Sequence, residues 1–321
     1  MSHTTVSRAL RGSSLVNSET RNRILSLAES MGYLPDLRAR SLVEGKRSVI
    51  GICTPDVLNP QFAQLCLRLR DTLWDRGYTC VFSLGHAVRA LTTFIGERVD
   101  GIVLIYGLDA HADIERLVRR ASTPCVTVGF LIDGIDGVGI DRRFGVAQGV
   151  HHLVERGLRR IGFAGVRGAD AKPHLQPHIE KESSFYEAVA NYGLTVRPEW
   201  EFCDARTRKD GYRFAQALAS LPTPDRPEAV FCQNDLVALG MTAGLLGAGI
   251  RVPDDVSILG FDDIPESAYA YPPLTTIRQP RDELVRSATE LLLARISGEL
   301  TDGFVHRREC GHVVVRASVR Q

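Results

Sequence analysis

The chain has 321 residues, of which 44% are hydrophobic and 24% are charged, and its formal net charge is +1. This ordinary globular composition excludes a disordered chain, a collagen-like fibre and a coiled coil. No apolar run approaches the roughly 20 residues that a membrane helix needs, and the chain begins with polar residues where a secretory signal is apolar. We therefore expect a cytoplasmic protein, not bound to a membrane, with two globular units of roughly 150 residues each.

Seven cysteines occur without any C-x-x-C pair, and most of them lie in apolar runs. This spacing does not favour a metal site or a disulfide framework. We expect buried, reduced thiols.

Positive charge is concentrated at the start of the chain. Residues 1–48 contain eight Lys or Arg against four Asp or Glu, so they carry +4 and leave −3 for the remainder. A local basic surface attracts phosphates, although a solvated helical face gives the same count. The local pattern has to decide between the two interpretations.

Two short helices are predicted in this basic segment. Residues 3–10 place Val6 and Leu10 on one helical face, and a second apolar face follows at i, i+3, i+4 and i+7. Asn17 or Ser18 can cap the second helix, and Gly32 can end it. The four apolar positions of the second helix are Ile24, Leu27, Ala28 and Met31.

Beyond Pro35, which interrupts the helical pattern, a short basic stretch extends to residue 47. It has too few apolar residues to fold alone, so we expect a linker that becomes helical on a partner.

From Val49 onward, apolar strands alternate with helices in two successive rounds. Such repeated units predict parallel, doubly wound sheets, and two rounds predict two lobes with a ligand cleft between them. Connecting segments should restrict the lobes to hinge motion. The expected helices include residues 60–76, 145–155, 183–192, 211–220 and 281–296, and one that follows the strand AVFCQND and ends at residue 247.

Enzyme signatures are missing from the sequence, so we expect no catalysis and no cofactor. His151 and His152 are adjacent, so on a helix they point about 100° apart and cannot clamp one metal ion. Asp262 and Asp263 end a strand, where a doubly wound fold places ligand contacts, which favours binding of hydroxyl groups over acid–base catalysis.

An ordered series of segments resembles the lactose-repressor/galactose-repressor family over nearly the whole chain. The segments are TTVSRALRG, SETRNRILSLAESMGYLPDLRARSL, VIGICTPDVLNPQF, VDGIVLI, HLVERGLRRIGFAG, VFCQNDLVALG, RVPDDVSILGFDD and PPLTTIRQP. The resemblance implies an α/β core of two parallel-sheet lobes, like the type I periplasmic sugar-binding proteins, behind a small all-α DNA-binding head. We expect the head at 1–34, a hinge at 35–47, the first lobe at 48–147 with 277–301, and the second lobe at 148–276 with 302–321.

The resemblance also implies which residues contact DNA. The segment TTVSRAL resembles the second helix of a helix-turn-helix, which lies in the major groove. Arg38 and Arg40 would approach phosphates. Leu42 resembles a leucine that wedges into the minor groove, although it also fits the role of an ordinary packing leucine. The expected contacts on the helix are Thr4, Thr5, Ser7 and Arg8.

Family members begin with a further helix before this segment, which the present sequence lacks, either because the head is truncated or because the start codon is assigned too far downstream. Val6 and Leu10 would then lose part of their cover, and DNA binding would weaken. The alternative function is a cytoplasmic ligand-binding sensor without specific DNA binding.

For the effector, the resemblance implies contacts from both lobes. Gln61 and Phe62 match positions of the first lobe, and Phe62 can stack on a sugar or base face. Two positions depart from the family, since Lys181 replaces an arginine and Gly129 replaces an aspartate, and lysine cannot form the bidentate fork of arginine. The contacts expected from the second lobe are Lys181, Arg206, Asn234 and Asp262.

Together these features predict a ligand-responsive DNA-binding repressor that senses a small, sugar-like effector. A palindromic operator would match a two-fold symmetric homodimer. No heptad repeat follows the final strand, which favours a dimer over a tetramer.

Overall fold

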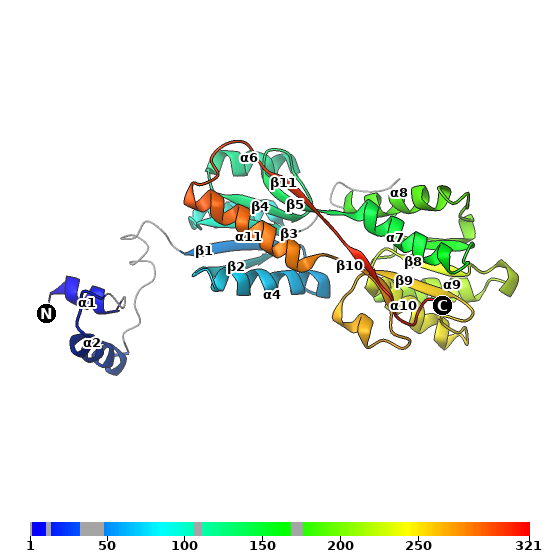
Figure 1. Ribbon diagram of the computed structural model, residues 1–321, viewed down its shortest axis with the longest axis horizontal. Coiled ribbons are helices and arrows are strands. Elements are labelled where there is room, and N and C mark those ends of the chain that lie inside the picture. The colour runs from blue at the N-terminus through cyan, green and yellow to red at the C-terminus, as the bar shows by residue number, and fades with distance from the viewer. Residues whose placement is uncertain (1, 11–13, 33–47, 106–110, 168–175) are drawn as a thin grey trace. The chain divides into compact units, whose positions relative to one another are not determined.

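The computed structural model describes residues 2–10, 14–32, 48–105, 111–167 and 176–321 (Figure 1). The chain forms two compact units, Met1–Ser48 and Val49–Gln321. The first contains the basic head, and the second contains both sheets. Within the described ranges, no helix is long and apolar enough to cross a membrane.

The head consists of helices α1 (His3–Leu10) and α2 (Ser18–Ser30). Asn17 caps α2, because its side-chain oxygen accepts from the backbone N–H of Thr20 at 2.8 Å. The buried core comprises Ala9, Val16 and Ile24, against which Val6 and Leu10 pack in part. This core covers only part of the predicted apolar face of α2. Leu27 and Met31 are exposed.

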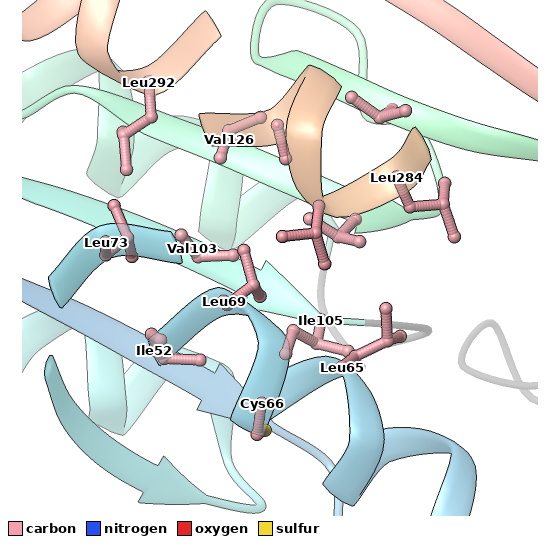
Figure 2. Close-up of a cluster of buried hydrophobic side chains, with 14 of the residues drawn as sticks. Ile52, Leu65, Cys66, Leu69, Leu73, Val103, Ile105, Val126, Leu284 and Leu292 are labelled. Carbon is pink, nitrogen blue, oxygen red and sulfur yellow. The ribbon is translucent and has the colours of Figure 1, made fainter. Parts of the chain in front are cut away.

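The first lobe contains a six-stranded parallel sheet in the order β11-β5-β4-β3-β1-β2. The inner strands of this sheet supply residues to two apolar clusters, as a sheet buried on both faces requires. Helices α4 (Pro60–Trp74) and α11 (Arg281–Ser297) cover one face, and Leu69, Val103 and Leu284 belong to the buried cluster between these helices and the sheet (Figure 2). Helices α5 (Ala87–Gly96) and α6 (His111–Ala121) cover the other. The strands are β1 (Val49–Thr54), β2 (Thr79–Leu84), β3 (Gly101–Ile105), β4 (Cys125–Gly129), β5 (Asp136–Asp141) and β11 (His306–Cys310).

The second lobe repeats this arrangement with the sheet order β12-β10-β9-β8-β6-β7. Helices α7 (Arg142–Glu155) and α8 (Gln176–Ala190) cover one face, and α9 (Arg208–Ala219) and α10 (Asp235–Gly247) cover the other. Short 3₁₀ helices lie at Pro198–Trp200, Thr223–Asp225 and Pro265–Ala268. The strands are β6 (Ile161–Gly165), β7 (Glu201–Cys203), β8 (Ala229–Cys232), β9 (Ser257–Asp262), β10 (Thr275–Arg278) and β12 (His312–Val314).

Three segments cross between the lobes, and Figure 1 shows them side by side at the centre of the core. The chain crosses from β5 into α7, from β10 into α11, and from β11 into β12. Gly311 makes the third crossing, where a Cβ atom would overlap the backbone carbonyl oxygen of Arg278 in the second crossing. A side chain would therefore push these two crossings apart.

The crossings correct the expected lobe boundaries. The first falls after Asp141 instead of residue 147, because Asp141 caps α7 by accepting from the N–H of Phe144 at 2.8 Å. The second leads through Gln279 into α11 instead of falling after residue 276. The third falls at Gly311 instead of residue 302, because β11 pairs with β5 in the first sheet. The chain then enters the second sheet against the direction of β10, so β12 is antiparallel in an otherwise parallel sheet.

The cysteines do not all follow the expected pattern. Four are buried and two are half-buried, but Cys310 is exposed. Cys310 lies at the end of β11, an edge strand whose other side chains are also largely exposed. The expectation of a buried thiol is wrong for Cys310.

Glycines set the close approach of α9 and α10, which allows a sharp test of the packing. A Cβ atom on Gly240 would overlap the backbone carbonyl oxygen of Arg208. We expect Gly240→Ala to lower the free energy of unfolding by about 1–3 kcal/mol, because backbone cannot move aside as a side chain can. Urea unfolding followed by circular dichroism measures the change.

Gly96→Ala is the matched control, because a Cβ atom on Gly96 would meet no atom within 4 Å. This change should be neutral or raise the free energy of unfolding by up to about 1 kcal/mol. Equal destabilisation by the two substitutions would contradict the packing described for α9 and α10.

Candidate functional site

The candidate DNA-binding residues lie on α1 and in the linker. Thr4 and Arg8 are exposed, on the side of α1 away from buried Ala9. Thr5 is half-buried, and its hydroxyl lies 2.9 Å from that of Ser2. The side chain of Ser7 lies outside the described residues, as do Arg38, Arg40 and Leu42.

Asp262 ends β9 beside the second crossing, in a backbone turn that is unusual for residues with side chains. Its φ is +127°, and that of Asp263 is +56°, whereas residues other than glycine seldom adopt positive φ. The guanidinium of Arg281 donates to the carbonyl oxygens of Asp262 and Asp263 at 2.7 and 2.8 Å. These two bonds hold the turn from outside.

Two arginines fix the second carboxylate of this turn. Arg278 and Arg316 each donate to Asp263 at 2.6 Å. Burial alone would raise the pKa of Asp263, but these guanidinium groups hold it below its usual value. Asp263 is therefore a structural anion, and Asp262 presents the carboxylate that faces the network described next.

A chain of side-chain amides connects Asp262 to the first lobe. Gln279, in the second crossing, donates through Nε2 to Asp262 Oδ1 and accepts through Oε1 from Gln61 Nε2 at 2.8 Å. Gln61 lies in the first turn of α4 and is buried, and its Oε1 accepts from Arg281 at 2.7 Å. We call Gln61, Asp262, Gln279 and Arg281 the crossing network. It joins the first lobe, the second crossing and the second lobe.

Lys181, on α8, lies at the edge of this network and is buried. Its Nζ donates to the backbone carbonyl of Gln233 at 2.8 Å and lies 3.9 Å from the centre of the Phe261 ring. Asp262 Oδ1 is also 3.9 Å away, too far for a hydrogen bond. Burial lowers the pKa of Lys181 to about 8, against the opposing attraction of Asp262. Burial also raises the pKa of Asp262, which Lys181 in turn counters.

Arg142 supplies a second buried cation at the first crossing. It begins α7, donates to Glu180 at 3.0 Å, and donates to the backbone carbonyl of Gly129 in the first lobe. Gly129 is the position where the resembling family has an aspartate, and its φ of +85° suits glycine. Arg142 thus joins α8 to the first lobe.

The other expected effector residues are engaged elsewhere. Asn234 caps α10 by accepting from the N–H of Val237 at 2.8 Å, and it donates to the carbonyl of Arg206 at 3.2 Å. The side chain of Arg206 is exposed, and Phe62 packs half-buried against the core of the first lobe. Of the six predicted residues, the network and its edge bring together Gln61, Lys181 and Asp262.

Sequence reasoning missed Gln279, Arg281 and Arg142. The segment RQPRDEL could have indicated the first two, because Pro280 precedes the final helix and is flanked by the polar residues Gln279 and Arg281. The predicted boundary before residue 277 assigned both residues to the interior of the first lobe and not to a segment that crosses between the lobes. Arg142 was hidden in the same way by the late boundary of the first crossing.

Asp263, Gln279 and Arg281 also line a cavity of about 460 Å³ between the second and third crossings. Among the described residues, no group of three or more His, Cys, Asp or Glu could hold a metal ion. The arrangement offers carboxylate acceptors and amide groups that both donate and accept, which suits recognition of ligand hydroxyls.

Comparisons with known proteins match both parts of the chain. Residues 1–36 match the family described as bacterial regulatory proteins, lacI family, and residues 150–319 match a periplasmic binding protein-like domain. A relative from Escherichia coli strain K12, the HTH-type transcriptional repressor CytR, is 31% identical over 328 residues, which cover 100% of this chain and 93% of CytR. The repressor PurR of Haemophilus influenzae is 31% identical over 304 residues, covering 92% of this chain and 88% of PurR.

Solved structures share the fold over almost the whole chain. The lac repressor dimer bound to operator superposes with a TM-score of 0.82 at 23% identity, covering 99% of this chain and 95% of that one. The transcriptional regulator CelR in complex with cellobiose superposes with a TM-score of 0.73 at 26% identity, covering 99% and 96%. With matches at both ends and relatives along its full length, the chain belongs to the lacI family of bacterial regulatory proteins.

Proposed function

We propose that the chain is a cytoplasmic transcriptional repressor that binds operator DNA through its head and responds to a small, sugar-like effector in its core. The crossing network carries this proposal, because it places hydroxyl-binding groups where the two lobes are joined. A ligand at that position can change the angle between the lobes. The core has a binding role and no catalytic one, as expected of relatives that are repressors.

The effector acts by exchanging hydrogen bonds. The side chains of Asp262 and Gln61 are connected through hydrogen bonds to Gln279. A ligand hydroxyl that bonds to Asp262 competes with the amide of Gln279. Ligand binding would therefore change the hydrogen bonds that connect the two lobes. CelR is described in complex with cellobiose, which supports a sugar or a related polyol as the class of effector.

The head binds DNA through the exposed side of α1. Exposed Thr4 and Arg8 would meet bases or phosphates in the major groove, because α1 buries its opposite side. Thr5 and Ser7 remain contacts implied by the family. The hinge contacts remain those implied by the family, with Arg38 and Arg40 at phosphates and Leu42 in the minor groove.

Replacing Arg8 tests the DNA-binding half of the proposal. The full chain first selects its operator from random DNA, and affinity is then measured at several salt concentrations. We expect Arg8→Ala to lower operator affinity about 10-fold and to reduce the slope of log affinity against log salt by about 1.

Arg213→Ala is the matched control, since Arg213 is an exposed arginine on α9 of the core. It should bind operator like the unaltered chain. Failure of the unaltered chain to select any sequence over random DNA would overturn the repressor function and favour the ligand sensor without specific DNA binding.

We also propose that two copies associate through the edge of the first sheet and read a palindromic operator. Strand β2 ends this sheet, so one side of its backbone has no partner strand among the described residues. Its outward side chains are apolar, with Val81, Phe82 and Leu84 all more than 40% exposed. A second copy buries this edge at both protomers by two-fold symmetry.

Leu84→Asp tests this surface, because it places a charge in the proposed interface. We expect the sedimenting mass to fall to that of one chain, with loss of cooperative binding to the two half-sites. Val315→Asp is the control, since Val315 is equally exposed but lies beyond β12 in the second lobe. Unchanged sedimentation of Leu84→Asp would remove β2 from the interface.

A further inference from the structure

Two cations are buried beside the crossing network. The side chains of Lys181 and Arg142 are only 6% and 4% exposed. Moving a charge from water into a protein costs several kcal/mol unless close partners replace the lost hydration. The groups around these cations therefore show whether the protein itself compensates the buried charges or whether a ligand could do so.

Lys181 has little direct compensation. Within the described ranges, its ammonium contacts the carbonyl of Gln233 and the ring of Phe261, and both groups are uncharged. Burial, together with repulsion by Arg142, outweighs the attraction of Asp262, Asp235 and Glu180 and lowers the pKa of Lys181 to about 8. A purely structural ion pair would bring ammonium and carboxylate into hydrogen-bond contact, whereas Lys181 and Asp262 stay 3.9 Å apart.

The nearby carboxylates are also bonded to other groups. Asp235 accepts from the N–H of Ile264 and from the hydroxyls of Ser267 and Thr276, and its burial and the charge of Asp262 raise its pKa to about 7. Asp262 accepts from Gln279, and Glu180 accepts from Arg142 at 3.0 Å, so the carboxylates whose charges act on Lys181 are engaged in other hydrogen bonds.

We propose that the effector carries an anionic group, a carboxylate or a phosphate, which Lys181 and Arg142 receive while Asp262 and Gln61 bind its hydroxyls. This inference rests on the proposed function, because it assigns the ligand to the same network. It narrows the class of effector from a neutral sugar to an acidic or phosphorylated polyol.

Calorimetric titration of the full chain with sulfate tests the anion site, because sulfate keeps its charge across the pH range used. Ionic strength is held constant with chloride. We expect saturable binding, and we expect Lys181→Met to weaken it about 10- to 100-fold, as loss of a charged hydrogen bond does. Lys181→Arg should retain it. Arg143→Met is the control, since Arg143 neighbours Arg142 on α7 but its side chain is 70% exposed.

The pH dependence gives a second measurement that does not require Lys181→Met to fold. An anion binds the protonated ammonium, so affinity should fall as pH rises through about 8 in the unaltered chain. Arginine stays protonated, so Lys181→Arg should not show this fall. Ionisation of Asp235 and Asp262 affects both proteins, and the difference between the two curves isolates Lys181. Glu180 and Arg142 face the same group and are likewise common to both.

Glucose, gluconate and glucose 6-phosphate then identify the source of the charge on one carbon skeleton. Tighter binding of gluconate indicates a carboxylate, and tighter binding of glucose 6-phosphate indicates a phosphate. Absence of saturable sulfate binding, equal binding to Lys181→Met, or equal affinity for all three sugars would overturn the inference. Operator binding is measured separately, so loss of the repressor function would show there and not in the sulfate titration.

Discussion

One guanidinium group holds together the parts of the core that a ligand must move. Arg281 bonds to the carbonyl oxygens of two consecutive aspartates with positive φ and to the side chain of Gln61 in the other lobe. Such backbone conformations cost about 1–3 kcal/mol each and persist only where surrounding contacts enforce them. The position of the Asp262 carboxylate therefore depends on a residue that begins a helix of the first lobe.

This dependence explains how ligand binding can be transmitted. The side chains of the crossing network bond one another, so an effector that binds there competes with these hydrogen bonds. The net gain from each exchange is small, about 0.5–1.5 kcal/mol, and a ligand shifts the equilibrium only by its differential affinity for the two states. Three crossings limit the response to a hinge movement, because each lobe is packed on both faces of its sheet.

Much of this architecture follows from the sequence. The alternation of apolar strands and helices predicted two parallel-sheet lobes, and the run of matching segments identified the family. The edge strand β11 was missed because its residues, HRREC, carry no apolar pattern, and its pairing with β5 depends on tertiary context. Because β11 was not predicted, the third crossing was placed too early and Cys310 was expected to be buried.

The candidate site was only partly predictable for a related reason. Asp262, Gln61 and Lys181 follow from the family pattern, but Gln279, Arg281 and Arg142 gain their importance from where the chain crosses between lobes. A local pattern predicts helices and strands but does not show which polar residues the crossings bring together over 200 positions of sequence separation, as they do for Gln61 and Gln279. Their hydrogen bonds could be found only in three dimensions.

The most direct test of the central claim is a double-mutant cycle between Gln61 and Gln279, measured by urea unfolding of the full chain. Gln61→Met and Gln279→Met each remove the hydrogen bond between the two side-chain amides, which joins α4 to the second crossing. If the crossing network ties the lobes together, the two substitutions should be non-additive, with a coupling energy of about 0.5–3 kcal/mol. Effects that add within about 0.3 kcal/mol would contradict the claim, because they would mean that the two amides do not act as one link.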